Sequence, residues 1–169
     1  FIIEEIYNKV HEVEAESGKT FGGDKNPLLV SVRSGARVSM PGMMDTILNL
    51  GLNDETVEVL AKETNNERFA YDSYRRFVLM FTNIAKGHPR TEMDKMLEQL
   101  KEEKGYKLDT EVTAEELKEL VAKYKAYYKS VFGEEFPSDP YVQLSEAVTA
   151  VFRSWDNPRA NVYRKMNSI

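Results

Sequence analysis

Cysteine is absent from the 169-residue sequence. Its absence excludes a disulfide framework, a thiolate metal site and a cysteine nucleophile. A chain without cysteine is compatible with the reducing cytosol, and we expect a cytoplasmic protein. Long apolar runs are also absent, since none approaches the roughly eighteen residues that span a bilayer. We therefore expect no membrane partner.

Positive charge is scarce, because 23 lysines and arginines stand against 28 acidic residues, for a net charge of −5. This balance argues against nucleic acid as a partner, since a nonspecific nucleic-acid binder would be basic. It does not exclude a small phosphate-bearing ligand, which needs only local positive charge. Histidine is limited to His11, on a helix surface, and His88, in a Gly-His-Pro-Arg turn. We expect neither to be catalytic.

We also expect no signal peptide in this sequence, because Phe1-Ile2-Ile3 is followed at once by Glu4-Glu5. The sequence starts without methionine and inside a helical pattern, so we expect a piece cut from a longer protein. Apolar residues make up 41% of the sequence and charged residues 30%. These fractions are typical of a soluble globular domain.

The stretch from Leu28 to Asn53 differs in pattern from the rest of the chain. Leu28–Val32 is a short apolar run rich in β-branched residues, which predicts a strand. Since the run does not alternate with polar residues, we expect it to be buried on both faces. Pro41-Gly42 predicts a turn, and Thr46–Leu50 predicts a second strand.

Polar and polarisable side chains surround this predicted turn. Arg33 ends the first strand, and its planar fork of donors matches phosphate oxygens. Ser34 and Thr46 add hydroxyls, Asp45 could face a metal or a ribose, and Met43 is suited to lying over a flat ring. The alternative is a solvated surface arginine with methionines that only pack.

After residue 53 the composition changes to helical periodicity. We expect one helix over residues 1–17, before the strands. Further helices are expected from a cap at Asn53 or Asp54 to a break at residues 64–66, over residues 67–86, and from Thr91 to Gly105. Two more are expected to start at a capping box at residues 113–116 and at Asp139-Pro140. Residues 18–27 are expected to form a loop. The fold class is therefore mainly α (α+β): a bundle-like helical domain with one small hairpin of residues 28–33 and 46–50. The residues expected to face inward include Val13, Phe69, Val142 and Phe152.

The string LLVSVRSGARVSMPGMMDTILNLGLND, at residues 28–54, resembles the N-terminal nucleotide-binding domain of the pyruvate phosphate dikinase family. The strings RFAYDSYRRF (68–77), EEFP (134–137) and VFRSWDNPRANVYRKMN (151–167) extend the resemblance over essentially the whole chain. The resemblance implies part of an ATP-grasp domain. Residues 1–52 would belong to its first subdomain, residues 53–141 would form a helical subdomain, and residues 142–169 would lead to its second half.

The resemblance also implies the roles of individual residues. Arg33 matches the arginine that grips the ATP phosphates during transfer, which makes it both a binding and a catalytic residue. Ser34, Met43, Asp45 and Thr46 match the motif and would line the nucleotide. Mg²⁺ is implied too, with its ligands outside this sequence. The resemblance likewise implies a glycine-rich loop whose lysine contacts phosphate, and this loop too would lie outside this sequence.

The reaction implied by the resemblance converts ATP, phosphate and pyruvate to AMP, diphosphate and phosphoenolpyruvate, reversibly, through a phosphohistidine. The implied partners are ATP or AMP, the phosphohistidine domain of the same parent chain and a second copy in a homodimer. This chain alone is expected to be inactive. Two alternatives stay open: a helical structural or docking module, and a phosphotransferase of the phosphoenolpyruvate synthase type.

Four further arginines receive no ligand role. Arg75 and Arg76 are expected to form structural ion pairs within an aromatic-rich helix. Arg153 is expected to lay its stem on the indole of Trp155. Arg159 has no assigned role.

Overall fold

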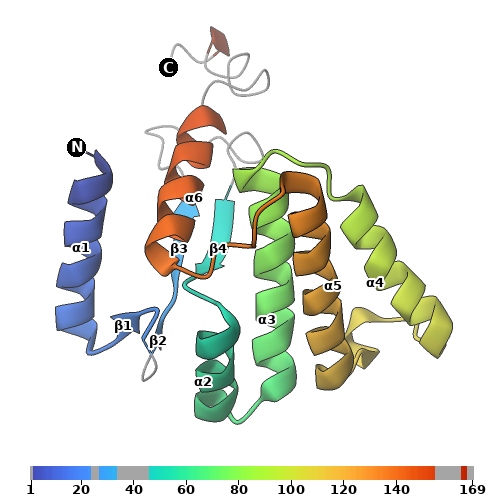
Figure 1. The fold of residues 1–169 in the computed structure, drawn as a ribbon. Helices are drawn as coiled ribbons and strands as arrows, with labels where there is room; N and C mark the ends of the chain where they lie inside the picture. The colour runs from blue at the N-terminus through green and yellow to red at the C-terminus, as the bar shows by residue number, and fades with distance from the viewer. Residues whose placement is uncertain (1, 24–26, 34–45, 155–164, 167–169) are drawn as a thin grey trace.

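The structure is a computed structural model that describes residues 2–23, 27–33, 46–154 and 165–166 (Figure 1). Its elements follow the order α1 (Ile2–Ser17), β1 (Thr20–Phe21), β2 (Pro27–Leu28), β3 (Val30–Arg33), β4 (Thr46–Leu50), α2 (Asp54–Thr64), α3 (Glu67–Met80), η1 (Phe81–Ala85, a π-helix), α4 (Thr91–Lys104), η2 (Asp109–Glu111, a 3₁₀ turn), α5 (Ala114–Phe132) and α6 (Pro140–Ser154). The prediction of a mainly helical fold with a small β part is confirmed. No helix in the described ranges is long and apolar enough to cross a membrane.

The elements are arranged around α3, which packs against α2 and α5 along its length and against β4 (Figure 1). α6 covers β3 and β4 and also contacts η1. α4 lies on the outer side of α5, and α1 stands at the opposite edge of the fold (Figure 1). The β3–β4 pair is thus held between α3 and α6.

The predicted hairpin is confirmed, because β3 and β4 pair antiparallel. Their register places Val30 opposite Leu50, Val32 opposite Ile47 and Arg33 opposite Thr46, with an irregularity between Val30 and Val32. β1 and β2 form a second, parallel pair, whereas residues 18–27 were expected to be only a loop and Leu28 was expected to begin the hairpin strand. Strands of two residues are too short to leave a periodic signal in sequence, which explains the difference.

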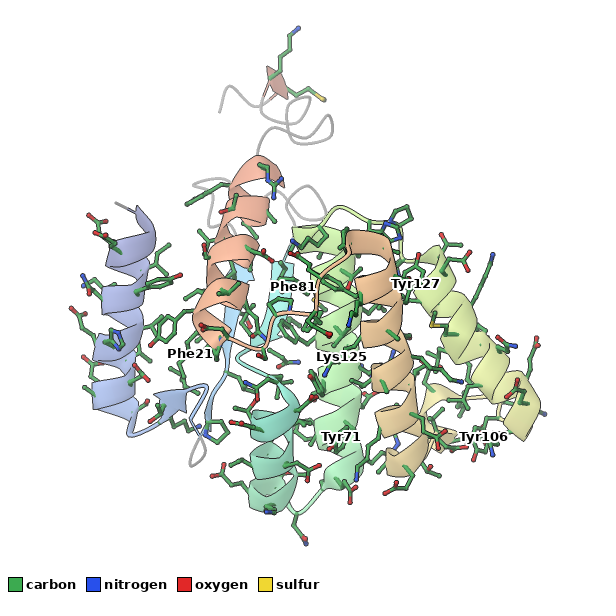
Figure 2. The ribbon with its side chains drawn as sticks, in the orientation of Figure 1. Phe21, Tyr71, Phe81, Tyr106, Lys125 and Tyr127 are labelled. Carbon is green, nitrogen blue, oxygen red and sulfur yellow. The ribbon has the colours of Figure 1, made fainter. Side chains whose placement is uncertain are left out.

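Aromatic side chains fill the core between α3, α5 and the loop before α6 (Figure 2). Phe77 and Phe81 lie one helical turn apart, and both meet the ring of Phe136 edge to face, at 5.8 and 5.2 Å between centroids. Tyr128 of α5 meets Phe136 in the same way at 5.2 Å. Such edge contacts add to the free energy of burying the rings. Tyr124 is also buried, and Tyr127 is half-buried.

The capping predictions for the helical part are confirmed. The Asn53 side chain accepts hydrogen bonds from the backbone N–H groups of Glu55 and Thr56, which satisfies two donors at the start of α2. The Thr113 side chain accepts a hydrogen bond from Glu116 N–H at the start of α5, and the Glu116 carboxylate accepts one from Thr113 N–H. The predicted helix over 67–86 is α3 continued by one π-helical turn, in which Lys86 N–H donates to the carbonyl of Phe81.

Two predictions of burial are wrong. Val13, Phe69, Val142 and Phe152 are 45, 50, 43 and 58% exposed, because each lies beside rather than on the buried stripe of its helix. The Leu28–Val32 run is not buried on both faces, since Ser31 is exposed and Val30 and Val32 are half-buried. β3 pairs with β4, and its residues line an apolar groove of about 460 Å³ shared with α1 and α6.

Candidate functional site

The candidate site is the base of the β3–β4 hairpin. Arg33 is the last residue of β3, Thr46 is the first of β4, and the register pairs them directly. The structure therefore brings two of the five predicted site residues to facing backbone positions. The side chains of these two residues, and Ser34, Met43 and Asp45 altogether, lie outside the described part of the chain.

The hairpin has a rigid support. Ile47 and Leu50 of β4 are fully buried, and β4 packs on α3 while β3 packs on α6. The Leu48 backbone N–H points to the sulfur of Met80 at the end of α3, at 3.4 Å. Packed strands of this kind hold the residues at their ends more precisely than a loop does.

The far end of β4 turns sharply into α2. Asn49 has φ +63° and Gly51 has φ +109°, and a side chain at Gly51 would come within 3.0 Å of the Leu28 carbonyl oxygen and of the Phe21 ring. Gln143 of α6 is fully buried beside this turn and hydrogen-bonds to it. We did not single out Gln143 from the sequence; the available signal was a lone glutamine on the apolar face of the predicted helix.

Ionisable groups form a network on the α2, α3 and α5 surface. The Asp54 carboxylate accepts hydrogen bonds from Lys125 Nζ at 2.8 Å and from the Tyr74 hydroxyl at 2.9 Å. Partial burial opposes ionisation of Asp54, but the Lys125 and Tyr74 contacts outweigh it and lower the pKa of the carboxyl. Burial, together with Asp54, raises the pKa of Tyr74 well above its ordinary value. The network joins three helices and needs no ligand to explain it.

The arginines of α3 are structural, as predicted. Asp72 accepts hydrogen bonds from both Nε and an Nη of buried Arg75, and it also pairs with Arg76 at 3.0 Å. Arg153 is exposed on α6, whereas Trp155 and Arg159 lie outside the described residues.

Both histidines have local partners. His11 Nδ1 lies 2.8 Å from a Glu14 carboxylate oxygen, and His88 Nε2 lies 2.7 Å from the Tyr127 hydroxyl. Within the ranges that the structure describes, no three histidine or acidic side chains gather as a metal site would require. The described residues therefore do not form a Mg²⁺ site.

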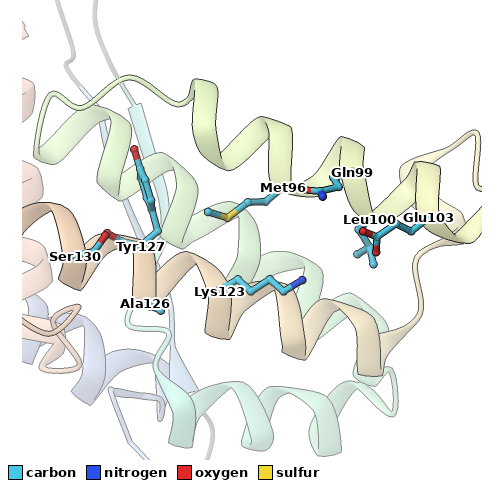
Figure 3. A pocket seen from close by; sticks show the side chains of 8 residues that line it. All are labelled: Met96, Gln99, Leu100, Glu103, Lys123, Ala126, Tyr127 and Ser130. Atoms are coloured by element: carbon cyan, nitrogen blue, oxygen red, sulfur yellow. The ribbon is translucent and has the colours of Figure 1, made fainter.

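Two hollows lie in the helical part, away from the hairpin residues. One, of about 370 Å³, lies between α4 and α5, and Figure 3 shows the residues that line it: Met96, Gln99, Leu100, Glu103, Lys123, Ala126, Tyr127 and Ser130. The other, of about 550 Å³, lies between α3 and α4 and is lined by Arg75, Arg76 and Arg90 with Asp94, Glu98 and Asp109. Arg90 pairs with Asp94 within this hollow at 2.9 Å, whereas Arg75 and Arg76 pair with Asp72 and Asp109 pairs with Lys101 at 2.8 Å. The arginines of the second hollow are all paired, whereas Lys123 of the first hollow has no ion-pair partner among the described residues.

The chain is similar to known proteins over its whole length. The family described as "Pyruvate phosphate dikinase, AMP/ATP-binding domain" matches residues 2–169. A pyruvate, phosphate dikinase of Clostridium symbiosum is 58% identical over 99% of this chain and 19% of its own length. The corresponding proteins of Entamoeba histolytica and of Zea mays chloroplasts are 58 and 56% identical, over 97 and 98% of this chain and 18 and 17% of their own lengths.

The chain thus spans less than a fifth of the curated relatives it matches. The family match supports the dikinase resemblance over the expectation of a phosphoenolpyruvate synthase relative. The chain belongs to the pyruvate phosphate dikinase family, and it matches the AMP/ATP-binding domain of that family.

Proposed function

We propose that this chain forms part of the ATP site of a pyruvate phosphate dikinase. The observation that carries the proposal is the pairing of Arg33 with Thr46 at the base of the hairpin, in a chain of an AMP/ATP-binding family. Two residues of the phosphate motif thereby start from adjacent, rigidly supported positions. A guanidinium placed there meets two phosphate oxygens at once.

The other motif residues complete the proposed site. The hydroxyls of Ser34 and Thr46 donate to phosphate oxygens, and Met43 lies against the base. Asp45 accepts from the ribose or faces the metal. Arg33 binds most strongly where charge develops on the transferred group, which makes it a catalytic residue as well as a binding one.

The parent protein carries out the whole reaction in this proposal. ATP transfers its terminal diphosphoryl group to a histidine of a separate domain, releasing AMP; phosphate then takes one phosphoryl group, and pyruvate takes the other to give phosphoenolpyruvate. Mg²⁺, where bound, would neutralise phosphate charge, and the resemblance implies that its ligands lie outside this sequence. The division into an ATP-grasp part (1–52), a helical subdomain (53–141) and a linking segment (142–169), the homodimer and the cytoplasmic location belong to the same proposal.

Amide hydrogen exchange in the full-length parent enzyme tests the site. Addition of ATP should slow exchange in residues 30–33 and 46–50, because a bound nucleotide rigidifies the hairpin base. Residues 96–103 of α4, which line the α4–α5 hollow, serve as the internal control and should be unaffected. Protection confined to α4, or none at all at the hairpin, would contradict the assignment.

This chain by itself should bind ATP weakly and form no AMP from it. The acceptor histidine is assigned to another domain, and neither His11 nor His88 stands in a phosphoryl-acceptor context. Incubating the purified chain with ATP and phosphate and measuring AMP checks this expectation. Production of AMP above the level without protein would show that the chain carries its own acceptor.

A further inference from the structure

The carboxamide of Gln143 holds the corner where β4 turns into α2. Its Oε1 accepts a hydrogen bond from Gly51 N–H at 3.0 Å, and its Nε2 donates to the carbonyls of Leu52 and Pro137 at 2.9 and 2.8 Å. The side chain is completely buried. Both of its N–H groups and its oxygen are therefore used, and all three partners are backbone groups.

Only a primary amide of this length matches that set of partners. A buried backbone group without a hydrogen-bond partner is costly, so an apolar side chain here would leave one N–H and two carbonyls unsatisfied. A carboxylate would keep the bond from Gly51 but would face the carbonyls of Leu52 and Pro137 without a proton to donate. The chemistry of the corner is thus specific to glutamine.

The corner also needs support from outside. Asn49 has φ +63° and Gly51 has φ +109°, conformations that an extended strand does not adopt on its own. Thr56 reinforces the corner by donating its hydroxyl to the Gly51 carbonyl at 2.8 Å. Such backbone persists where surrounding contacts fix it. Gln143 supplies two of those contacts, to Gly51 and Leu52, from a different element, α6.

The same side chain joins both ends of the segment 53–141. It binds the carbonyl of Leu52, just before the segment starts, and that of Pro137, just before it ends. The amide of Asn53 reinforces this junction by donating to the Ser138 carbonyl at 2.9 Å. This buried point thus joins the end of β4, the start of α6 and the helical segment, in addition to the packing of β4 on α3 and α6.

β4 connects this point to the candidate site. The strand runs from Gly51 back through Leu50 to Thr46, which stands opposite Arg33. β4 is paired with β3 on both sides of the irregularity in the ladder, at Leu50 and again at Ile47 and Thr46, so a displacement of the corner is carried along the ladder. We propose that Gln143 is a positioning residue that fixes, through β4, where Arg33 stands for the phosphates of ATP. This inference rests on the proposed function of Arg33.

The test uses the full-length parent enzyme and a double-substitution cycle. Gln143→Met keeps the length of the side chain and removes its hydrogen bonds. We expect it to lower the rate of AMP formation from ATP by about tenfold to a hundredfold, as small misplacements of a catalytic group do. Exchange between pyruvate and phosphoenolpyruvate should stay unchanged. Combined with Arg33→Ala, Gln143→Met should cause almost no further loss, because it acts through Arg33.

Two controls separate positioning from loss of stability. Gln99→Met is the matched control, because it makes the same substitution at the other glutamine of the sequence. Gln99 is exposed on α4. Leu120→Ala creates a cavity in α5 without touching the corner, and it should lower the melting temperature while leaving the rate of AMP formation at working temperature intact. If Gln143→Met gives no soluble enzyme, Gln143→Glu takes its place in the cycle.

The outcomes are distinct. The positioning role would be overturned if the losses in the rate of AMP formation from Gln143→Met and Arg33→Ala multiplied in the double variant. It would also be overturned if Gln143→Met lowered that rate no more than Leu120→Ala does at equal melting temperature. If Arg33→Ala slows AMP formation but Gln143→Met and Gln143→Glu do not, the positioning role fails and the proposed function stands. If Arg33→Ala leaves AMP formation intact, the proposed function itself fails.

Discussion

Arg33 and Thr46 stand opposite each other as a pair in the antiparallel β3–β4 ladder. The two residues therefore stand together at one end of a ladder whose strands pack on α3 and α6. A phosphate-binding segment gains from such a base, because the entropy of ordering its ends is already lost on folding.

Replacing Arg33 with alanine in the full-length enzyme should suppress the ATP half-reaction. The loss of a donor where charge develops typically slows a step by about a hundredfold to a thousandfold. Exchange between pyruvate and phosphoenolpyruvate should survive, because it proceeds from phosphohistidine without ATP. Arg33→Lys should restore little, since an ammonium cannot reproduce the two-pronged contact. The two half-reactions are measured separately on one preparation.

Arg76→Ala is the control for this change, because Arg76 is a 61% exposed arginine on α3 whose partner is Asp72. Its removal should leave both half-reactions intact. Equal losses of both half-reactions in Arg33→Ala would identify Arg33 as a folding residue.

Local signals predicted the boundaries of the helices well. Asn53, Thr113 and Gly105 stand where capping chemistry placed them, because a cap depends on a few neighbouring residues. The pairing of the two strands also followed from local pattern, since two apolar runs flank Pro41-Gly42; the predicted turn itself lies outside the described residues.

Burial was harder to predict, because it depends on which elements meet in space. Leu28–Val32 has the composition of a doubly covered strand, yet Ser31 is exposed beside an open apolar groove. Phe69 is apolar but lies off the buried stripe of α3. Gln143 could not be recognised from sequence, since its partners Gly51 and Pro137 are set by tertiary contacts.

The two strands of the hairpin should differ in their sensitivity to truncation. Ile47 is fully buried, so Ile47→Ala should lower the free energy of unfolding by about 2–5 kcal/mol. Val30 is half-buried, so Val30→Ala should cost only about 1 kcal/mol. Urea denaturation of the chain and of both variants compares the two. Equal losses would mean that Val30 is as well covered as Ile47.

Asn53 should contribute through two separate contacts. Its carbonyl oxygen caps α2, and its amide donates to Ser138. Asn53→Ala removes both and should cost about 1–2 kcal/mol of unfolding free energy. Asn53→Asp keeps the cap and loses only the donor, so it should cost less. Asn66→Asp, at the cap of α3, is the matched control and should be nearly neutral; a large loss there would show that the cap depends on the amide.

The buried tyrosines should make the chain sensitive to alkali. Burial raises the pKa of Tyr74, Tyr124 and Tyr128 above the ordinary tyrosine value of about 10. Below that pH both folded and unfolded chains keep these protons, and the contribution to stability is complete. As the pH rises above it, the unfolded chain loses protons that the folded chain retains. The free energy of unfolding should then fall by about 1.4 kcal/mol per pH unit for each such group.

Tyr74→Phe tests this assignment, because phenylalanine keeps the ring and removes the titrating hydroxyl. The variant should lose about 1 kcal/mol at neutral pH with the hydrogen bond to Asp54. Above pH 10, the unfolding free energy of the variant should then fall less steeply with pH than that of the unsubstituted chain. The difference in slope corresponds to one proton. Phe81→Leu, a buried change without an ionisable group, should shift the whole curve and keep its slope. Urea titrations between pH 8 and 11 give both quantities; an unchanged slope in Tyr74→Phe would show that the Tyr74 hydroxyl titrates in the folded chain as it does in the unfolded one.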